Sequence, residues 1–314
     1  MRIIFMGSPD FAVPCLEEML KSPHEVIAVV TQPDRPKGRG GKLQPTPIKI
    51  RAVAEGIPIY QPSKVNTPEF IQQMRELKPD LAVVVAFGQI LKPDLLNIPS
   101  LGCINVHASL LPKYRGSAPI HWAIINGEKV TGVTTMYLDP GMDTGDMILA
   151  EKVLIADDDT VGTLHDKLAL AGAGILYETV KLIDQGKAPR TAQNHEEATY
   201  APLLKREHEL IDWKKPVREV YDMVRGMNPW PGAYTTFNGK VLKIWESMID
   251  NEGVTGVPGS VVQVVNGQGI KVQCGDGCLW LCKVQPEGRR PMSADAFARG
   301  HRVEPDMFLG SVVP

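Results

Sequence analysis

The sequence feature that most constrains the fold is an unbroken apolar run at residues 81–87, which reads Leu-Ala-Val-Val-Val-Ala-Phe. Neither of the two faces that alternate along a strand carries a polar side chain here, so both must be covered, as in the central strands of parallel sheets. Residues 2–6 and 26–31 are further apolar runs, with a helix predicted between them to about Lys21. This rhythm predicts a Rossmann-like, doubly wound and mostly parallel α/β sheet.

The turn after the first predicted strand argues against a common ligand of such sheets. Gly7 is the only glycine in that turn. The G-x-G-x-x-G pattern that lets a backbone approach a dinucleotide pyrophosphate is absent. We therefore predict no nicotinamide cofactor.

Length and patterning predict two domains. The chain has 314 residues, which is enough for two hydrophobic cores. Further elements are predicted as strands at 102–106, 130–138 and 148–154 and as helices ending at 56 or spanning 68–78, 120–126 and 160–184. We place a catalytic domain at 1–189, a linker at 190–208 and a second domain at 209–314.

The character of the sequence changes after residue 208. A helix is predicted at 213–226 and a short last helix at 294–299, with short strands separated by glycine turns between them. These strands are expected near 233–237, 240–247, 259–265, 269–274 and 278–284. Their number and length are about right for a small closed barrel.

Composition excludes several classes of protein. Hydrophobic residues make up 43% of the chain and charged residues 22%, so the chain is neither disordered nor fibrous. No apolar run approaches the roughly 18 residues that span a bilayer, and no signal-peptide pattern is present, so we expect a cytoplasmic protein. The formal net charge of −2 excludes a globally basic nucleic-acid binder but not local basic patches.

The cysteines do not form a framework. The chain has five, an odd and scattered set that favours reduced thiols over disulfides. Cys274, Cys278 and Cys282 follow a C-x3-C-x3-C spacing that lacks the usual C-x2-C knuckle, and residues 278–282 read as a strand. We predict no metal site.

A basic segment follows the strand that ends at Thr31. Residues 32–49 are rich in proline and glycine and are predicted to form a long loop. Between residues 35 and 51 the chain has no carboxylate and carries these cations: Arg35, Lys37, Arg39, Lys42, Lys49 and Arg51. A charge run is usually a solvated surface, but long loops in compact domains are often functional, and this one leaves a sheet edge where ligands bind. We favour a loop that faces phosphate groups.

Polar side chains end the strand predicted at 102–106. Asn105 and His107 are separated by one residue, so they project from the same face of an extended chain. An irregular loop then follows before a helix begins near Ile120. α/β enzymes place their sites at such carboxyl ends of strands.

A second polar turn, residues 139–146, follows the strand predicted at 130–138. Its spacing lacks the ligand pattern of an EF-hand, so we predict no calcium site. One interpretation is a structural turn closed by aspartate hydrogen bonds. The other places an aspartate beside Asn105 and His107, where the amide can hold an oxyanion, the imidazole can move a proton, and the carboxylate can orient the imidazole or a water.

No activated nucleophile accompanies this set. Ser109 lies outside a G-x-S-x-G elbow, and Cys103 has no partner nearby in the sequence. Direct acyl transfer through a tetrahedral intermediate is therefore favoured over a covalent acyl-enzyme. A lone histidine on a strand is also often structural, and the residues alone leave that alternative open.

The motifs resemble a known family. Residues 105–120, Asn-Val-His-Ala-Ser-Leu-Leu-Pro-Lys-Tyr-Arg-Gly-Ser-Ala-Pro-Ile, together with residues 139–145, are similar to the signature of the 10-formyltetrahydrofolate-dependent formyltransferases. Residues 6–12, 32–40 and 228–233 resemble the branch that formylates methionyl initiator tRNA. The resemblance covers essentially the whole chain, and its least distinctive part is the carboxyl-terminal region.

The resemblance implies a direct formyl transfer from 10-formyltetrahydrofolate to the α-amine of methionyl initiator tRNA. Asn105 and His107 would polarise the formyl carbonyl, and Asp143 would position His107 and a water. The folate is implied to lie against the loop after the central strand, the loop after His107 and the second polar turn. The residues concerned are Phe87, Gly88, Gln89, Ile90, Leu91, Ser109, Leu110, Leu111, Pro112, Asp139 and Gly141.

The resemblance also implies how tRNA would be held. The basic loop, especially Arg39, would enter the acceptor end, and the second domain resembles an OB-like barrel suited to nucleic acid. The candidates are Arg35, Lys37, Arg39 and Lys42, together with Lys205, Arg206, Arg289 and Arg290, which are equally well explained as ordinary surface charge. A monomer is expected.

Two other functions remain open at this point. A formyltransferase acting on an amino sugar nucleotide or a purine precursor would use the same asparagine, histidine and aspartate, but would leave the basic loop and the second domain unexplained. A non-catalytic tRNA-binding protein would have no use for those three residues.

Overall fold

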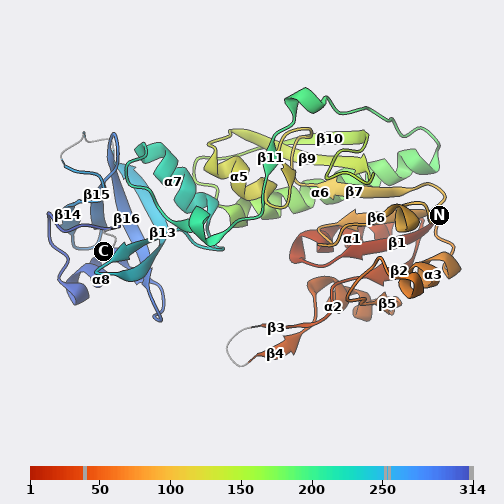
Figure 1. Ribbon diagram of the computed structural model, residues 1–314, viewed down its shortest axis with the longest axis horizontal. Coiled ribbons are helices and arrows are strands. Elements are labelled where there is room, and N and C mark those ends of the chain that lie inside the picture. Colours follow the sequence, from red (N-terminus) through yellow and green to blue (C-terminus); the bar gives the residue numbers. More distant parts are fainter. Residues whose placement is uncertain (38–40, 251–252, 254–255, 311–314) are drawn as a thin grey trace. The chain divides into compact units, whose positions relative to one another are not determined.

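The computed structural model of the chain describes residues 1–37, 41–250, 253 and 256–310. It forms two compact units that do not follow chain order (Figure 1). Unit 1 comprises residues 1–119, 130–154 and 165–201; unit 2 comprises residues 120–129, 155–164 and 202 onward. Within the part of the chain that is described, no helix is long and apolar enough to cross a membrane.

The strands up to residue 201 are β1 (Arg2–Gly7), β2 (Glu25–Val30), β3 (Arg35–Lys37), β4 (Lys42–Gln44), β5 (Ile59–Tyr60), β6 (Leu81–Val85), β7 (Cys103–His107), β8 (Arg115–Gly116), β9 (Val130–Tyr137), β10 (Met147–Leu154) and β11 (Tyr200–Ala201). The helices in the same stretch are η1 (Asp10–Ala12), α1 (Val13–Lys21), α2 (Pro47–Ala54), α3 (Pro68–Glu76), α4 (Pro93–Leu96), α5 (Pro119–Ile125), α6 (Val161–Asp184) and η2 (His195–Glu197).

The main sheet of unit 1 has the strand order β10-β9-β7-β6-β1-β2-β5. The five strands β5, β2, β1, β6 and β7 are parallel to one another. β9 is antiparallel to β7, and β10 is antiparallel to β9. From β1 the chain adds β2 and then β5, which is one edge of the sheet. It then crosses to the other side of β1 and forms β6. The prediction of a doubly wound, mostly parallel sheet is confirmed, and every residue of the central strand β6 is buried as expected.

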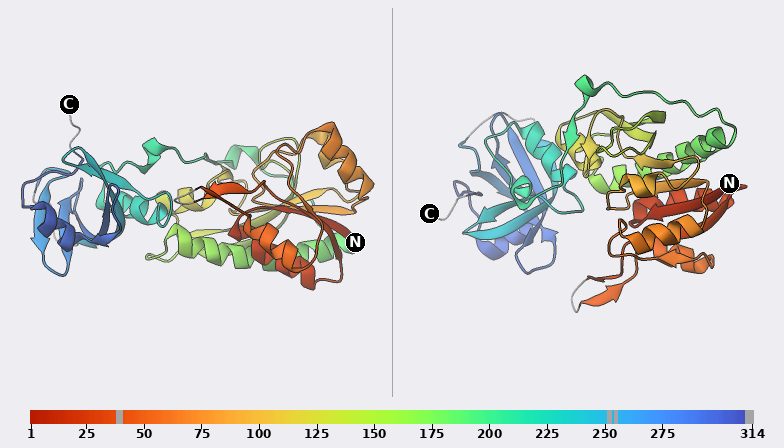
Figure 2. Two further views of the ribbon diagram at one scale, coloured as in Figure 1. Left: turned by 90° about the horizontal axis from the view of Figure 1, so that it is seen from below. Right: turned by 45° about the vertical axis from the view of Figure 1, so that its right-hand side comes forward.

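Helices cover both faces of this sheet (Figure 2). On one face α6 lies so close that a Cβ on Gly172 would be 3.1 Å from Val106 and 3.8 Å from Cys15 of α1. On the other face, α3 and α4 pack in a hydrophobic cluster that includes Met6, Val84 and Cys103. Side chains alternate between the two faces along β7, and Val106 lies on the α6 face. The other face, covered by α3 and α4, therefore holds Cys103, Asn105 and His107, and with them the predicted site.

The basic segment differs from the predicted long loop. β3 and β4 pair as an antiparallel hairpin, with Arg35 opposite Gln44 and Lys37 opposite Lys42. The helix that follows begins at Pro47, because the Thr46 hydroxyl accepts a hydrogen bond from the Lys49 N–H and proline suits a first turn. The prediction of one long loop over residues 32–49 is therefore corrected at residues 35–37 and 42–44, which are strands, and from Pro47, which begins a helix.

Unit 2 is built on an antiparallel sheet with the order β12-β13-β16-β15-β14, and β17 pairs with β16. Its elements are η3 (Arg206–Glu209), α7 (Val217–Gly226), β12 (Tyr234–Phe237), β13 (Lys240–Asp250), β14 (Val261–Val265), β15 (Gly269–Gln273), β16 (Cys278–Pro286), β17 (Met292–Ser293) and α8 (Ala294–His301). All five strands expected in this region are present. Of the described residues, none pairs β12 with β14, so the pairing path is open between its two ends. The helix predicted from residue 213 begins at Val217, after Pro216.

Candidate active site

β7 delivers Asn105 and His107 to one face of the sheet, as their spacing predicts. Asn105 lies opposite Val84 of β6 and Met136 of β9, and it is partly exposed. Its side-chain amide has no hydrogen-bond partner within the described part of the chain. A partly exposed amide on a central strand can donate a hydrogen bond to a ligand carbonyl.

His107 is buried, with 6% of its surface exposed, and its two ring nitrogens have different surroundings. Nε2 lies 2.9 Å from the Tyr114 carbonyl oxygen, which can only accept, so Nε2 carries a hydrogen. Nδ1 lies 3.7 Å from the Asp143 carboxylate, beyond hydrogen-bond distance but within reach of charge attraction. In a neutral ring, Nδ1 is therefore the nitrogen that is able to accept a proton.

Asp143 lies beside His107 because the 139–146 turn folds back over the sheet, which the sequence alone does not show. Because β9 is antiparallel to β7, its carboxyl end lies beside Cys103, and the Leu138 N–H donates to the Cys103 carbonyl at 2.8 Å. The 139–146 turn therefore starts at the far end of β7 and folds back over the sheet face. The Asp143 carboxylate accepts a hydrogen bond from the Gly116 N–H at 2.8 Å.

Both interpretations of this turn apply, but to different residues. The Asp139 carboxylate accepts hydrogen bonds from the Gly141 N–H at 2.9 Å and from the Thr144 hydroxyl at 2.7 Å, which closes the turn from within. Asp143 instead leaves its own turn and lies beside His107. The two aspartates belong to one sequence motif, but their contacts differ: Asp139 closes the turn and Asp143 approaches His107.

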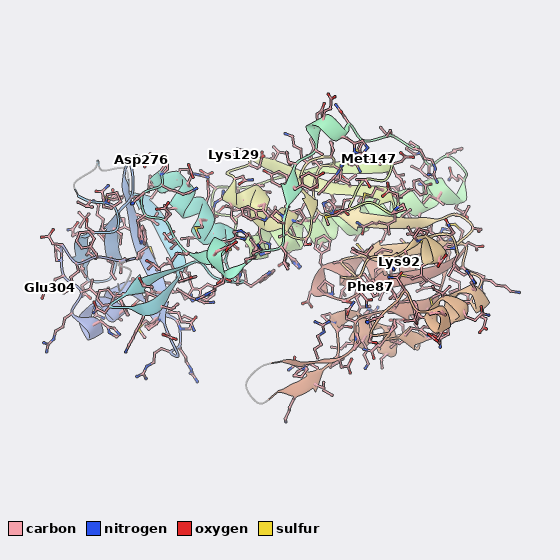
Figure 3. All side chains as sticks on the ribbon, viewed as in Figure 1. Phe87, Lys92, Lys129, Met147, Asp276 and Glu304 are labelled. Carbon is pink, nitrogen blue, oxygen red and sulfur yellow. The ribbon has the colours of Figure 1, made fainter. Side chains whose placement is uncertain are left out.

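The loop after β6 is held in place from several sides. Gln89 accepts a hydrogen bond from the Val65 N–H at 3.1 Å, and Asn66 donates to the Ile90 carbonyl at 2.8 Å. Gly88 has a positive φ of 82°, which glycine adopts without strain. Phe87 and Lys92, labelled in Figure 3, mark the two ends of this loop. The predicted folate-binding residues 87–91 thus form a braced edge from which Ile90 projects, 74% exposed.

The loop after His107 uses its own polar groups internally. The buried Ser109 hydroxyl donates to the Lys113 carbonyl at 2.6 Å, and the Thr134 hydroxyl donates to the Ser109 carbonyl at 2.7 Å. The Leu111 N–H donates to the Thr134 hydroxyl. The Ser109 side chain therefore shapes the loop, while Leu110, Leu111 and Pro112 follow it along the backbone.

Cys103 has the environment of an inert thiol. It is buried, and its burial raises the pKa of the thiol to about 12. A thiol with that pKa is protonated at neutral pH and is a poor nucleophile. This agrees with direct transfer rather than a covalent acyl-enzyme.

Two residues beside the site were not predicted from the sequence. Arg115 is 2% exposed and Gln193 is 5% exposed, and the two side chains are hydrogen-bonded to each other. Gln193 falls in the predicted 190–208 linker, because its neighbours are polar and show no periodicity. Nothing in the sequence marks these two residues as partners.

The cations of the basic segment have different partners. Lys49 pairs with Asp34 at 2.7 Å, and Arg51 pairs with both Glu17 and Glu55. Hydrogen bonds from Lys49 and Gln61 lower the pKa of Asp34. Lys42 is exposed on β4, and Arg35 is exposed on β3. Arg39 lies outside the described residues, and only the backbone of Lys37 is described.

The four cations predicted in or near unit 2 also differ. Lys205 is 3.7 Å from Glu207, and Arg206 pairs with Glu209 and lies over the ring of Tyr234. Arg289 and Arg290 are exposed between β16 and β17. Within the described residues neither of these two side chains forms an ion pair, so both are available to a phosphate group.

Comparison with known proteins decides the family. A model described as formyl transferase matches residues 1–180, and one described as formyl transferase, C-terminal domain, matches residues 203–302. A methionyl-tRNA formyltransferase of Desulforamulus reducens is 52% identical over 99% of this chain and 98% of its own length. One of Clostridioides difficile is 50% identical over 99% of this chain and all of its own. The chain belongs to the methionyl-tRNA formyltransferase family.

Solved structures agree with this family on the fold. A methionyl-tRNA formyltransferase from Clostridium thermocellum superposes with a TM-score of 0.56 at 16% identity, covering 80% of this chain and 94% of that one. HypX from Aquifex aeolicus, in complex with tetrahydrofolic acid, gives a TM-score of 0.66 at 17% identity over 95% of this chain. The match spans 47% of HypX, so this formyltransferase is about half as long.

Proposed function

We propose that this formyltransferase moves a formyl group from 10-formyltetrahydrofolate to the α-amine of methionyl initiator tRNA, by direct attack. The proposal rests on one observation. About half of the residues are identical, over nearly the full length, to those of curated proteins named for that activity. The geometry supports it, because His107 and Asp143 lie 3.7 Å apart, Asn105 shares the β7 face with His107, and the nearby Cys103 thiol is not ionised at neutral pH.

The donor site is proposed along the braced loops around β7. The family relationship and the tetrahydrofolate complex of HypX support a folate-type donor. We place the folate between residues 87–91, residues 109–112 and the turn that holds Asp139 and Gly141. Rigid backbone edges of this kind offer N–H and C=O groups that can read the donor and acceptor pattern of a pterin.

The proposed reaction needs an oxyanion site and one proton carrier. The neutral amine attacks the formyl carbon, a C–N bond forms, and the carbonyl oxygen becomes an oxyanion beside the Asn105 amide. The bond from the formyl carbon to N10 of the folate then breaks, and N10 needs a proton. His107 Nδ1 takes the proton that the attacking amine loses and returns it to N10, because Nε2 is held by Tyr114.

Asp143 completes this scheme through its charge. While His107 holds the proton, its ring is cationic and lies 3.7 Å from the carboxylate. The carboxylate can therefore attract the ring and hold its orientation while the proton is carried. The Gly116 N–H keeps the carboxylate in place.

Acceptor recognition is proposed to lie outside these three residues. The β3–β4 hairpin carries exposed cations at Arg35 and Lys42, with Arg39 between the two strands in the sequence. Arg289 and Arg290 offer further cations in unit 2. These groups would contact the phosphates of the tRNA and would contribute affinity that falls with salt.

The test uses purified chain, 10-formyltetrahydrofolate and methionyl initiator tRNA, with acid-stable label on the tRNA as the readout. His107→Ala should lower kcat by at least about 10²-fold, because the proton carrier is lost, while tRNA binding changes less than about twofold. Formylation of an amino sugar nucleotide with none on the tRNA would refute the proposed acceptor. Unchanged turnover in His107→Ala would refute the role of the imidazole.

A further inference from the structure

We propose that Gln193 is a positioning residue, which holds the Asp143 turn against His107 and is itself anchored by the buried Arg115. The inference rests on the proposed function, because it concerns how the carboxylate of that site is placed. It assigns a task to the 189–201 segment, which carries no sequence motif.

The Asp143 turn needs an external support. It leaves the sheet beside Cys103 and must return along β7 to reach His107, which lies opposite Thr134. Asp143 also has a positive φ of 52°, in the left-handed region that non-glycine residues seldom adopt. Aspartate enters this region more readily than most side chains, and the contacts around it fix where the turn lies.

Gln193 supplies those contacts from one amide group. Its Nε2 donates to the Asp143 carbonyl at 2.9 Å and to the Gly145 carbonyl at 2.8 Å. The end of the amide that faces two backbone carbonyls must be the nitrogen, because carbonyls only accept. The end that faces two guanidinium N–H groups must be the oxygen. Both hydrogens of the amide are thus used on the backbone that carries the Asp143 carboxylate.

Arg115 holds the opposite end of the same amide. Its Nε and Nη2 donate to the Gln193 Oε1 at 3.0 and 2.6 Å, and its Nη1 lies 3.2 Å from Nδ1 of His195. Across the described parts of the chain, no carboxylate lies within 4 Å of this guanidinium. A charged donor on Oε1 polarises the amide and strengthens the hydrogen bonds made by Nε2.

The neighbours of Arg115 join this support to the catalytic pair. Tyr114 accepts from His107 Nε2, and Gly116 donates to the Asp143 carboxylate. Residues 114–116 therefore fix the histidine, the carboxylate and, through Gln193, the backbone of the aspartate turn. Loss of the Gln193 donors should let the turn relax away from His107 without removing any group that touches substrate.

The experiment replaces Gln193 by Glu in the full chain, with Gln72→Glu on the exposed face of α3 as the matched control. Glu keeps the size and still pairs with Arg115, but sets an oxygen against the two turn carbonyls. We expect kcat to fall by about 10- to 100-fold, as displacements of about 1 Å do, with KM for tRNA within about twofold. Gln72→Glu should leave both parameters unchanged.

A second background separates positioning from general damage. In Asp143→Asn, measured by single turnover with excess enzyme, Gln193→Glu should cost less than about threefold, because the group it positions is already lost. Equal losses in both backgrounds, or a kcat for Gln193→Glu within about twofold of the unmodified chain, would overturn the proposal.

A milder variant covers the case in which Gln193→Glu does not fold. Arg115→Lys keeps the charge but removes the fork that holds the amide, and it should lower kcat in the same background-dependent way. Folding is checked by the thermal melt followed by circular dichroism, which should match that of the unmodified chain. The kcat ratios of all variants are measured with whichever acceptor the unmodified chain formylates. If that acceptor is not methionyl tRNA, the proposed function is refuted, but the test of Gln193 still holds.

Discussion

At the residue scale, spacing on a strand predicted part of the site and tertiary structure decided the rest. Asn105 and His107 share a face because strand side chains alternate, which one sequence is enough to show. That Asp143 would reach His107 followed from the family resemblance, since the turn starts at the far end of β7. Gln193 could not be predicted, because its partners are distant carbonyls with no sequence pattern.

The thiol beside the site provides a residue-scale prediction. Cys103→Ala should keep kcat within about twofold, because a buried thiol with a pKa of about 12 takes no part in transfer. The lost packing should lower the free energy of unfolding by about 1 kcal/mol, near the middle of the usual range for single substitutions. Urea unfolding and formylation of tRNA measure the two effects.

A chemical control accompanies this variant. Cys282 is only partly buried, so iodoacetamide at pH 8 should label it in preference to Cys103. A loss of activity in Cys103→Ala as large as that in His107→Ala would contradict direct transfer and point to an acyl-enzyme.

At the element scale, long periodic segments were predicted well and short ones poorly. β6 and α6 carry clear patterns, and both are present near their predicted bounds. β3 and β4 have three residues each, contain proline and lysine, and offer no alternation to detect. Their pairing depends on cross-strand register, which is not a property of either segment alone.

The hairpin gives a prediction that compares two cations of equal charge. Lys42→Ala should reduce the slope of log KM for tRNA against log salt by up to about 1, because one phosphate contact is lost. Arg51→Ala should leave the slope unchanged, since Arg51 is already paired with Glu17 and Glu55 on the α2 side. Formylation rates from low to moderate salt provide the measurement.

The two variants also exclude misfolding as an explanation. Turnover at saturating tRNA should stay near that of the unmodified chain for Lys42→Ala, because the chemical groups are untouched. Equal changes in slope for both variants would show that the hairpin does not face the tRNA.

At the scale of the whole molecule, the order of the chain and the compact units differ. The sequence prediction drew boundaries along the chain, at residues 189 and 209. In the structure, residues 120–129 and 155–164 pack with the carboxyl-terminal part. Periodicity identifies an amphipathic element but does not say which core its apolar face joins, so this exchange has no signature in one sequence.

A polar network, buried at Arg225 and Asp222 and exposed at Asp157, holds one of these segments to α7. Arg225, 4% exposed, donates to the Asp222 carboxylate at 2.6 Å and to the Asp159 carbonyl at 2.9 Å. Arg218 donates to Asp222 and to Asp157. Hydrogen bonds from Lys129 and Arg218 hold the pKa of Asp157 well below its usual range. A carboxyl with a depressed folded pKa stabilises the fold at neutral pH, and that stabilisation is lost as the pH falls through the folded pKa.

This network predicts where the stability of unit 2 is most sensitive. Arg225→Met should lower the free energy of unfolding by about 3 kcal/mol, because Asp222 stays buried with one cation instead of two and the Asp159 carbonyl loses its donor. Lys215→Met removes the same charge from an exposed pair with Glu219 and should cost less than about 0.5 kcal/mol. Thermal melts followed by circular dichroism compare the two. Equal shifts would mean that residues 155–164 are held to α7 by apolar packing alone, and that the network adds no stability.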